Sequence, residues 1–420
     1  MSAVDLSAAE RADLNGENGP LRQFAMSLVV RAAEIWRAPC LIKAGFAHID
    51  ACHFNGQAHL DFARMLACGN VRFPIPVWTN TLPVSLLQND GRADSDPDFV
   101  SGAREVAEIY RKLGCRPVWT CAPYQLPGGP GFGDQIIGSE SNAVAFYNSV
   151  VGARTQKYGD FLDVCCALTG RVPCAGLHRD DGRRGQVEFD LTGLSDALLR
   201  HEETCPLIGH IMGERAGSSI PVLRGLPGDT PQDNLKAMAA AAGASGGVAM
   251  FHAIGVTPEA PDAEAAYQGG TPEQVHRIIA DDLTVAKSSL STVTSGQLDM
   301  VALGTPHFSI HEFRRLAQAI EGQRIHADLR FYVSTARFVA DAARAEGLLD
   351  PIERAGVEIL TDTCTYFSPA VRACRGRVMT NSAKWAFYAP GMLPVKVCFA
   401  GLEDCVASAI RGEITLTNRA

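Results

Sequence analysis

Apolar and polar positions follow a regular pattern along the last third of the chain, and this pattern predicts a sheet. Short, mostly apolar runs of strand length lie at Leu298–Leu303, Leu329–Val333, Val357–Leu360 and Gly376–Met379. Apolar residues at helical spacing follow the first two runs, and Ser309 with Glu312 has the form of a capping box at the start of the first helix. Strands that alternate with helices predict a parallel α/β sheet.

The first two thirds of the chain carry weaker patterns. Helices are expected over 56–69, 143–151 and 161–168, the second of them capped by Ser139 or Ser141. Strands are expected at Val71–Thr79, Pro117–Cys121 and Val248–Val256. The first of these strands contains Pro74 and Pro76, which would confine it to a sheet edge.

Polar side chains lie where the predicted strands end. Along the last third of the chain these residues are Thr305, then Ser334 and Thr335, then Thr363 and Cys364, and finally Asn381, Ser382 and Lys384. The segment Pro117–Thr120 likewise ends at Cys121. Ligands of open α/β sheets bind beyond the carboxyl ends of the strands, so we expect the functional site there. Cys121 and Cys364 are both delivered to such an end by a Thr-Cys step, which allows them to meet.

Composition and charge exclude several classes of protein. The 420 residues are 46% hydrophobic and 20% charged, which is ordinary for a globular protein and excludes a disordered chain. The net charge of −8, without a basic run, argues against binding to nucleic acid. The polar N-terminus is no signal sequence, and Gly246–Gly247 interrupts the longest uncharged stretch, so we expect a soluble, cytoplasmic protein without a membrane span.

The 13 cysteines point to reduced thiols rather than disulfides. Their number is odd, and no C-x-x-C spacing occurs, which counts against a zinc ribbon, a thioredoxin motif and a ferredoxin-type run. Two histidine-containing groups stay open as mononuclear metal sites. The first is His48, Asp50, Cys52, His53 and His59, and the second is His307 with His311.

Two further motifs give weak or divided signals. The G-x-S-x-G string around Ser245 lies between a predicted helix and a predicted strand, the reverse of the order in a serine hydrolase. Ser382 and Lys384 allow two interpretations: Ser382 caps a helix, or both residues face an anionic substrate at a strand end.

Six short strings, taken together and in order, resemble a known family. They are Thr120–Tyr124, Ser139–Val144, Asn148–Thr155, Ala302–His307, Thr361–Cys364 and Thr380–Lys384. The series is similar to the large, catalytic part of aconitase X, an outlying branch of the aconitase superfamily. The resemblance runs from about His48 to Pro390 and implies an aconitase-like, multi-lobed α/β architecture. In this architecture, parallel sheets are flanked by helices and the site lies at the strand carboxyl ends.

The resemblance implies a dehydratase whose iron–sulfur cluster acts as a Lewis acid on a substrate hydroxyl and carboxylate. Cys121 and Cys364 match the family's cluster ligands. Thr305 stands where the archaeal branch has a further cysteine, so a three-cysteine cluster is in doubt and Cys374 is the substitute we consider. The cluster type stays open between 2Fe-2S and 3Fe or 4Fe-4S. Thr305 in place of this cysteine also favours one branch of the family over the other. The favoured branch dehydrates cis-3-hydroxy-L-proline to Δ1-pyrroline-2-carboxylate, and the alternative is the branch of the 5-phosphomevalonate dehydratase large subunit.

The resemblance also implies substrate contacts and a partner. Ala51, Cys52 and His53 match a backbone-rich substrate loop, Asn80 a polar contact, and Glu140 and Ser141 the pocket beside the cluster, while Ser382 and Lys384 match catalytic positions. The family has a small swivelling domain or subunit, so we expect a separate small partner and poor turnover by this chain alone. We expect a flexible arm at 1–20, a catalytic region of two or three lobes at 21–410 and a tail at 411–420. The rival from another class is a scaffold subunit without a cluster.

Overall fold

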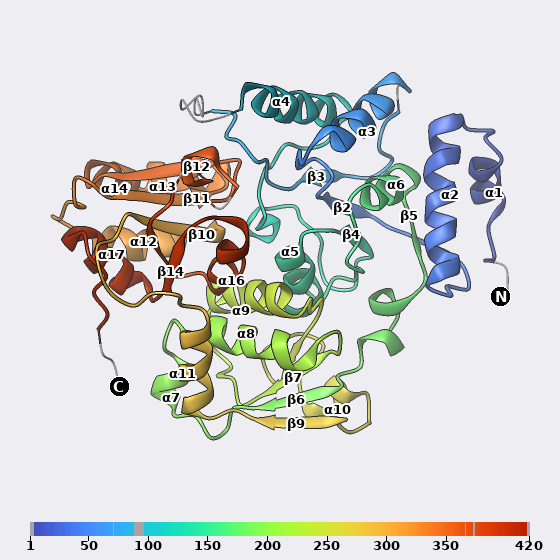
Figure 1. Ribbon diagram of the computed structural model, residues 1–420. Helices are drawn as coiled ribbons and strands as arrows, with labels where there is room; N and C mark the ends of the chain where they lie inside the picture. Colours follow the sequence, from blue (N-terminus) through green and yellow to red (C-terminus); the bar gives the residue numbers. More distant parts are fainter. Residues whose placement is uncertain (1–3, 70, 88–95, 366, 373, 418–420) are drawn as a thin grey trace.

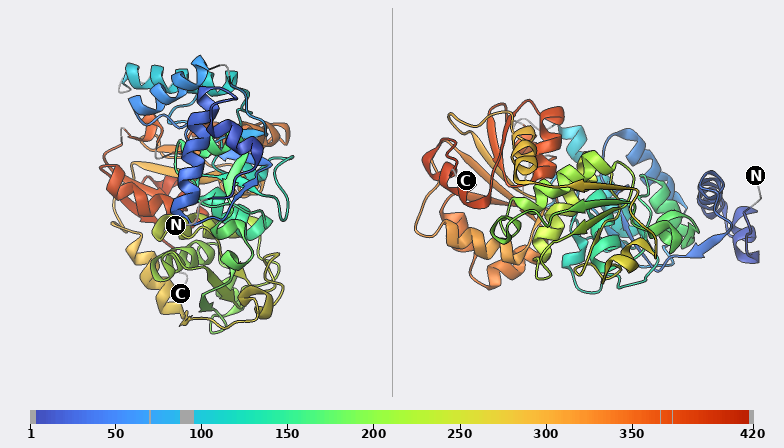
Figure 2. Two further views of the ribbon diagram at one scale, coloured as in Figure 1. Left: turned by 90° about the vertical axis from the view of Figure 1, so that its right-hand side faces the viewer. Right: turned by 90° about the horizontal axis from the view of Figure 1, so that it is seen from below.

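Four sheets organise the part of the chain that the computed structural model describes, which comprises residues 4–69, 71–87, 96–365, 367–372 and 374–417. The sheets fall into three lobes that follow one another along the chain (Figure 1). The first lobe and the last lobe lie side by side, and the middle lobe lies below both in this view. The first lobe extends into a pair of helices at one end of the molecule (Figure 2).

The first lobe is built on a three-stranded parallel sheet of order β3-β2-β4. Its strands are β2 (Phe46–Ile49), β3 (Val77–Thr79) and β4 (Ile136–Gly138), and a separate antiparallel pair joins β1 (Leu41–Lys43) to β5 (Arg171–Pro173). The helices are α1 (Ala8–Leu14), α2 (Pro20–Ile35), α3 (Gln57–Cys68), α4 (Pro97–Lys112), α5 (Ser141–Phe146), which continues as a π-helix over Tyr147–Val151, and α6 (Leu162–Thr169). Buried apolar side chains of this sheet and of α2, α3, α4 and α6 form one core.

The middle lobe has a four-stranded parallel sheet of order β8-β7-β6-β9. Its strands are β6 (Val187–Asp190), β7 (Pro221–Arg224), β8 (His252–Ala253) and β9 (Gln274–Arg277), and its helices are α7 (Asp196–Leu199), α8 (Thr204–Ala216), α9 (Gln232–Ser245), α10 (Ala263–Tyr267) and α11 (Ala280–Ser289). Helices α8 and α9 are packed so closely that a Cβ at Gly209 would clash with the backbone of Met238. The alanine-rich sequence of α9 therefore serves close helix packing.

The last lobe contains the regular sheet that the sequence predicted. Five parallel strands lie in the order β12-β11-β10-β13-β14. They are β10 (Met300–Phe308), β11 (Arg330–Thr335), β12 (Val357–Thr361), β13 (Arg377–Thr380) and β14 (Lys396–Phe399), and the helices are α12 (Ile310–Ala319), α13 (Arg337–Ala345), α14 (Leu349–Arg354), α15 (Pro369–Arg372), α16 (Ala383–Met392) and α17 (Leu402–Arg411). The capping box is confirmed, since Ser309 and Glu312 exchange hydrogen bonds at the start of α12.

Three predicted strands are shorter than expected or absent. Only Val77–Thr79 of Val71–Thr79 is a strand, at the edge of its sheet as the prolines require, and only His252–Ala253 of Val248–Val256. Pro117–Cys121 is not a strand, because Pro117 lacks an N–H group and Trp119 adopts a positive φ of 43°.

The N-terminal segment that was expected to be a flexible arm contains helix α1. A capping box of Ser7 and Glu10 starts this helix, and Glu10 pairs with Arg171 of β5 at 2.6 Å. Residues 1–3 of the expected arm and 418–420 of the expected tail lie outside the described residues. Among the described helices, none is both long and apolar enough to cross a membrane.

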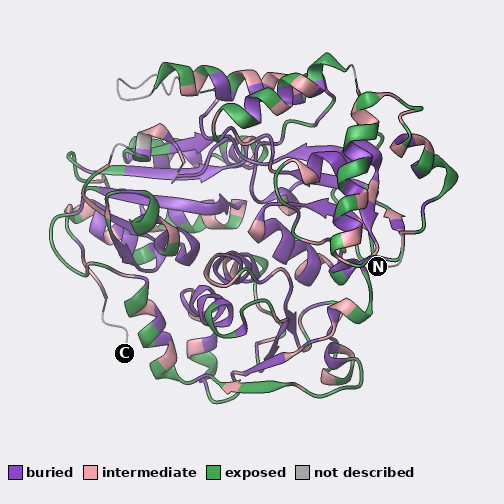
Figure 3. Cartoon of the chain, turned by 45° about the vertical axis from the view of Figure 1, so that its right-hand side comes forward, coloured by how far each residue is buried: buried purple, intermediate pink, exposed green. Residues whose placement is uncertain are grey.

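Buried helices join the three lobes. Helix α9 packs against α8, α5 and α16, which come from all three lobes. Most residues of α8 and α9 are buried (Figure 3). Residues that follow β2, β3 and β4 line the same cavity as residues that follow β12 and β13. The fold thus creates one cavity between the strand ends of two sheets.

Candidate active site

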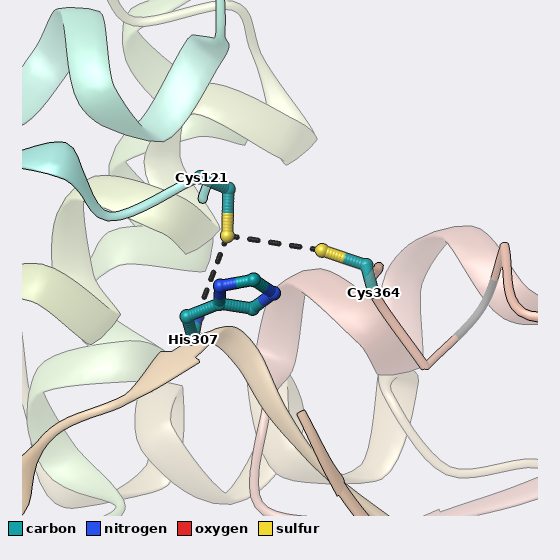
Figure 4. A group of neighbouring side chains, drawn as sticks. All are labelled: Cys121, His307 and Cys364. Atoms are coloured by element: carbon teal, nitrogen blue, oxygen red, sulfur yellow. Dashed lines mark hydrogen bonds between the residues drawn. The ribbon is translucent and has the colours of Figure 1, made fainter. Parts of the chain in front are cut away.

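Two cysteines from different lobes meet in the lining of this cavity. The sulfur atoms of Cys121 and Cys364 lie 3.7 Å apart, and both side chains are buried (Figure 4). Two sulfur ligands of one tetrahedral metal ion lie about 3.8 Å apart, given a metal–sulfur bond of about 2.3 Å. The pair therefore has the spacing of two ligands of one metal centre.

His307 completes the group of possible metal ligands in the described part of the chain. Ligand atoms of Cys121, His307 and Cys364 all lie within 4.8 Å of one another. The imidazole is already engaged on both sides, because Nε2 donates to the Thr363 carbonyl at 3.0 Å and Nδ1 accepts from the Thr120 hydroxyl at 2.9 Å. Burial lowers the pKa of His307 to about 4, so the ring is neutral and braces the two Thr-Cys steps.

The backbone of His307 also contacts Cys121. Its N–H donates to the Cys121 sulfur at 3.3 Å, a hydrogen bond drawn in Figure 4. The geometry arises in a bulge of β10, where the register with β11 shifts between Leu303 and Phe308. Gly304 in this bulge has φ of 88°, and a Cβ there would clash with the backbone of Ser334. The bulge thus aims the His307 amide at the thiol.

The surroundings of Cys364 disfavour its deprotonation to a thiolate in the absence of a metal. The neighbouring Cys121 sulfur and burial together raise the pKa of Cys364 well above its usual value. A metal cation at the pair would reverse this preference, since thiolates are the form that binds metals. The arrangement is thus suited to a metal and poorly suited to a free nucleophile.

A buried ion pair lies beside the two cysteines. The Lys384 ammonium donates to Glu140 Oε1 and, at 3.3 Å, to the Ser141 hydroxyl. Glu140 also caps α5 by accepting from the Ala143 N–H at 2.7 Å, so the cap is neither Ser139 nor Ser141 as predicted. Burial raises the pKa of Glu140, but Lys384 and the Ala143 amide outweigh it and lower the pKa overall. Glu140 is therefore an ionised carboxylate.

Most of the predicted site residues line one cavity of about 340 Å³. The predicted residues in its lining are His53, Asn80, Cys121, Glu140, Ser141, Thr305, Cys364 and Lys384. His53 is held by a hydrogen bond from its Nδ1 to the Thr81 carbonyl at 2.9 Å and by ring contact with Phe367. Burial lowers the pKa of His53 to about 4, which makes it a neutral acceptor in the cavity.

The loop over residues 50–53 is anchored from below by Asp163, which sequence reasoning did not select. One oxygen of this buried carboxylate accepts from the N–H groups of Asp50 at 2.7 Å and Ala51 at 3.2 Å, and from the Ser139 hydroxyl at 2.9 Å. Ala51 and Cys52 are fully buried and do not line the cavity, and the Cys52 thiol points at backbone carbonyls. Their part in the site is confined to the backbone.

Ser382 and Cys374 lie apart from the cavity. The Ser382 hydroxyl donates to the Thr305 carbonyl and accepts from the Trp385 N–H, which is the helix-cap alternative of the two we considered. Cys374 lies near Asp299 and Arg330, which act on its pKa and mark the amino ends of β10 and β11. Cys374 thus lies at the amino ends of the strands, just before β13 begins, whereas Cys364 lies at their carboxyl ends.

The two histidine-containing metal sites do not form. His48 donates to the Thr120 carbonyl, His59 contacts Asp160, and the Cys52 thiol is turned away from both. His311 is paired with Arg314 at the surface. Within the described residues, Cys121, His307 and Cys364 form the one group of three or more possible metal ligands.

Asp50 and Asp160 line the cavity as well, and their importance was missed. The sequence showed Asp50 only as a member of a possible metal group and gave no sign of Asp160. Burial and the Asp160 carboxylate raise the pKa of Asp50 to about 7. This effect depends on an encounter between two loops that sequence spacing does not reveal.

Comparison with known proteins identifies the family. Models of the first, second and third domains of aconitase X match residues 3–181, 185–288 and 298–411. The chain belongs to the aconitase X family. Its fold is also that of the crystal structure of Thermococcus kodakaraensis aconitase X in the holo form, with a TM-score of 0.86 and 28% identity over 97% of this chain and 100% of that one.

Named relatives fall into two groups. The cis-3-hydroxy-L-proline dehydratases of Pseudomonas aeruginosa and Hypocrea jecorina are 41% and 38% identical; the matches span 97% and 98% of this chain and 70% and 69% of theirs. The phosphomevalonate dehydratase large subunit of Thermococcus kodakarensis is 30% identical over 91% of this chain and 94% of its own length. This chain is thus more similar to these two hydroxyproline enzymes than to this large subunit.

Proposed function

We propose that the chain is the large subunit of an iron–sulfur-dependent hydro-lyase that dehydrates cis-3-hydroxy-L-proline to Δ1-pyrroline-2-carboxylate. The observation that carries the proposal is the pair of buried sulfurs, Cys121 and Cys364, at 3.7 Å in a cavity that also holds charged groups of both signs. The higher identity to two cis-3-hydroxy-L-proline dehydratases supports this substrate.

Cys121 and Cys364 are the residues we propose as ligands of the iron–sulfur group. The spacing of the two sulfurs and the hydrogen bond from the His307 N–H to Cys121 fit thiolate ligands. Hydrogen bonds to ligand sulfurs are a known means of tuning the reduction potential of iron–sulfur groups. When bound, the group supplies a Lewis acid that eases departure of the substrate hydroxyl. We do not propose Cys374 as a third ligand, because it lies near Asp299 and Arg330 at the amino ends of the strands. Thr305 also lines the cavity, and its hydroxyl would be a weaker iron ligand than the cysteine of the archaeal branch.

Lys384 and Glu140 are the charged residues we propose to act on the substrate beside the metal group. The ammonium of Lys384 is fixed by Glu140 and Ser141, so it is held in place as a donor to a substrate carboxylate without reorganisation. Elimination of water next to a carboxylate builds negative charge on that carboxylate, and a fixed cation stabilises it. Ser382 contributes by holding the Thr305 carbonyl and the start of α16 rather than by direct contact across this cavity.

We further propose that a small subunit completes the active site. The Thermococcus kodakarensis and Methanosarcina mazei relatives are named large subunits, and this chain spans 94% and 98% of them, whereas it spans 70% of the Pseudomonas dehydratase. We keep 21–410 as the proposed catalytic region, and the partner would supply the general base that the described residues leave unassigned.

The test is an activity assay on anaerobically purified, iron-loaded protein. Dehydration of cis-3-hydroxy-L-proline is measured for the chain alone and with the part of the Pseudomonas relative that the chain does not cover, added as a separate polypeptide. We expect slow turnover alone and a large increase on addition. Full activity of the chain alone would exclude the partner. Dehydration of 5-phosphomevalonate, with no turnover of the proline substrate under either condition, would contradict the proposed substrate.

A further inference from the structure

Three residues that line the cavity form what we call the acceptor wall: Asp50, Asn80 and Asp160. Asp50 follows β2, Asn80 follows β3, and Asp160 precedes α6, so three separate segments converge there. Asn80 is a substrate contact by resemblance alone, whereas Asp50 and Asp160 have no assigned role in the reaction. Asp160 is partly exposed, and His59 donates to it at 3.2 Å.

The hydrogen bonds within the wall leave an acceptor without a donor. Asn80 donates its amide N–H to Asp50 Oδ1 at 2.6 Å, which orients the side chain. Asn80 is only 4% exposed, and its Oδ1 has no hydrogen-bond partner among the described residues. A buried acceptor without a partner is costly. The orientation of Asn80 therefore calls for a ligand that brings an N–H or O–H donor.

The charge of the wall calls for a cation. Burial, then the Asp160 carboxylate, raises the pKa of Asp50 to about 7, and Glu140 and Asp163 act in the same direction. A buried carboxylate with a second carboxylate beside it binds a positively charged group favourably. The cavity lining also contains Lys157 and Lys384, so it presents both signs of charge. Such a lining suits a zwitterion better than a phosphate dianion.

We propose that the acceptor wall binds the secondary ammonium of a cyclic amino acid, with Asp50 and Asp160 as its anionic acceptors and Asn80 Oδ1 as a neutral one. This inference rests on the proposed function and names the feature that selects its substrate class. A ring nitrogen held as an ammonium has no lone pair to bind iron. Its positive charge also makes the neighbouring Cα–H more acidic, which favours the proton removal that dehydration requires.

The test compares two probes that differ at the ring heteroatom. L-proline carries the ammonium, and tetrahydrofuran-2-carboxylate replaces it with an ether oxygen. Binding of each to the full chain is measured by calorimetry for the wild type, D50N and D160N, with D61N as a control that removes one surface carboxylate from α3. We expect D50N and D160N to weaken L-proline binding roughly 10- to 100-fold, as loss of a charge-assisted hydrogen bond predicts. Both variants should bind tetrahydrofuran-2-carboxylate as tightly as the wild type or more tightly.

Equal weakening of both probes, or unchanged L-proline binding in D50N and D160N, would overturn the assignment, as would failure of the wild type to bind L-proline. D160N keeps the test open should D50N fold poorly, because Asp160 is partly exposed. The outcome is separable from the proposed function. If the wild-type enzyme dehydrates cis-3-hydroxy-L-proline with a KM that D160N leaves unchanged, the wall is wrong and the function stands. If L-proline binds selectively and D50N and D160N weaken this binding, but the enzyme does not dehydrate cis-3-hydroxy-L-proline, the wall stands and the proposed function is wrong.

Discussion

The sulfur atoms of Cys121 and Cys364 lie 3.7 Å apart although 243 positions separate them in the chain. The neutral imidazole of His307 bonds to the residue before each cysteine, Thr120 and Thr363, and so ties the two segments together. A site assembled between lobes in this way depends on buried polar contacts on every side.

Replacing Lys384 by Met should leave Glu140 as a buried, unpaired carboxylate. Loss of one partner of a buried ion pair typically costs about 3–5 kcal/mol, and we expect a loss of that order in the free energy of unfolding at pH 8. In the wild type the lowered pKa of Glu140 contributes stability above its unfolded pKa. In K384M that pKa rises, so the protein is more stable when Glu140 is protonated and loses stability as the pH rises through the new value.

Chemical denaturation of K384M and K384M/E140Q at pH 5 and pH 8 checks this prediction. The single variant should lose more stability at pH 8 than at pH 5, and the second substitution should restore part of the loss at pH 8. Equal losses at both pH values, with no recovery in the double variant, would mean that Glu140 is not held by Lys384.

Replacing Asp163 by Ala should release the substrate loop over residues 50–53. The carboxylate accepts from Asp50, Ala51 and Ser139, and these buried donors would lose their partner. We expect a destabilisation on the order of 3 kcal/mol, together with a higher KM, since the loop carries His53. D61A on the exposed face of α3 is the matched control. If D163A unfolds at the same denaturant concentration as D61A, Asp163 does not anchor the loop.

Binding of a cyclic amino acid should strengthen as the pH rises toward neutrality. Burial and Asp160 raise the pKa of Asp50 to about 7, with Glu140 and Asp163 also facing it and Glu140 neutralised by Lys384. A cation binds the ionised form of Asp50, so each pH unit below that pKa should weaken L-proline binding by up to about tenfold, and binding should level off above it. Calorimetry between pH 5.5 and 8.5 measures this slope, which D50N should flatten. A steep slope that persists in D50N would assign the titration to another group.

The sequence was informative where periodicity was strong and where polar residues followed a strand. It predicted the parallel sheet of the last lobe, the capping box at Ser309 and the possibility that Cys121 meets Cys364. It was wrong about Pro117–Cys121, where Pro117 lacks an N–H group and Trp119 adopts a positive φ that helix and strand periods do not reveal. The roles of Asp163 and Asp160 depend on contacts between segments more than 100 residues apart, to which helix and strand periods are blind.

Iron and acid-labile sulfide per chain, measured on anaerobically purified and reconstituted protein, test the central claim most directly. We predict roughly stoichiometric iron and sulfide in the wild type, their loss in C121S and in C364S, and retention in C374S, whose thiol lies at the amino ends of the strands. The numbers of iron and sulfide bound per chain would identify the cluster type. Reconstituted wild type with neither iron nor sulfide, or C121S and C364S that keep both, would contradict the account.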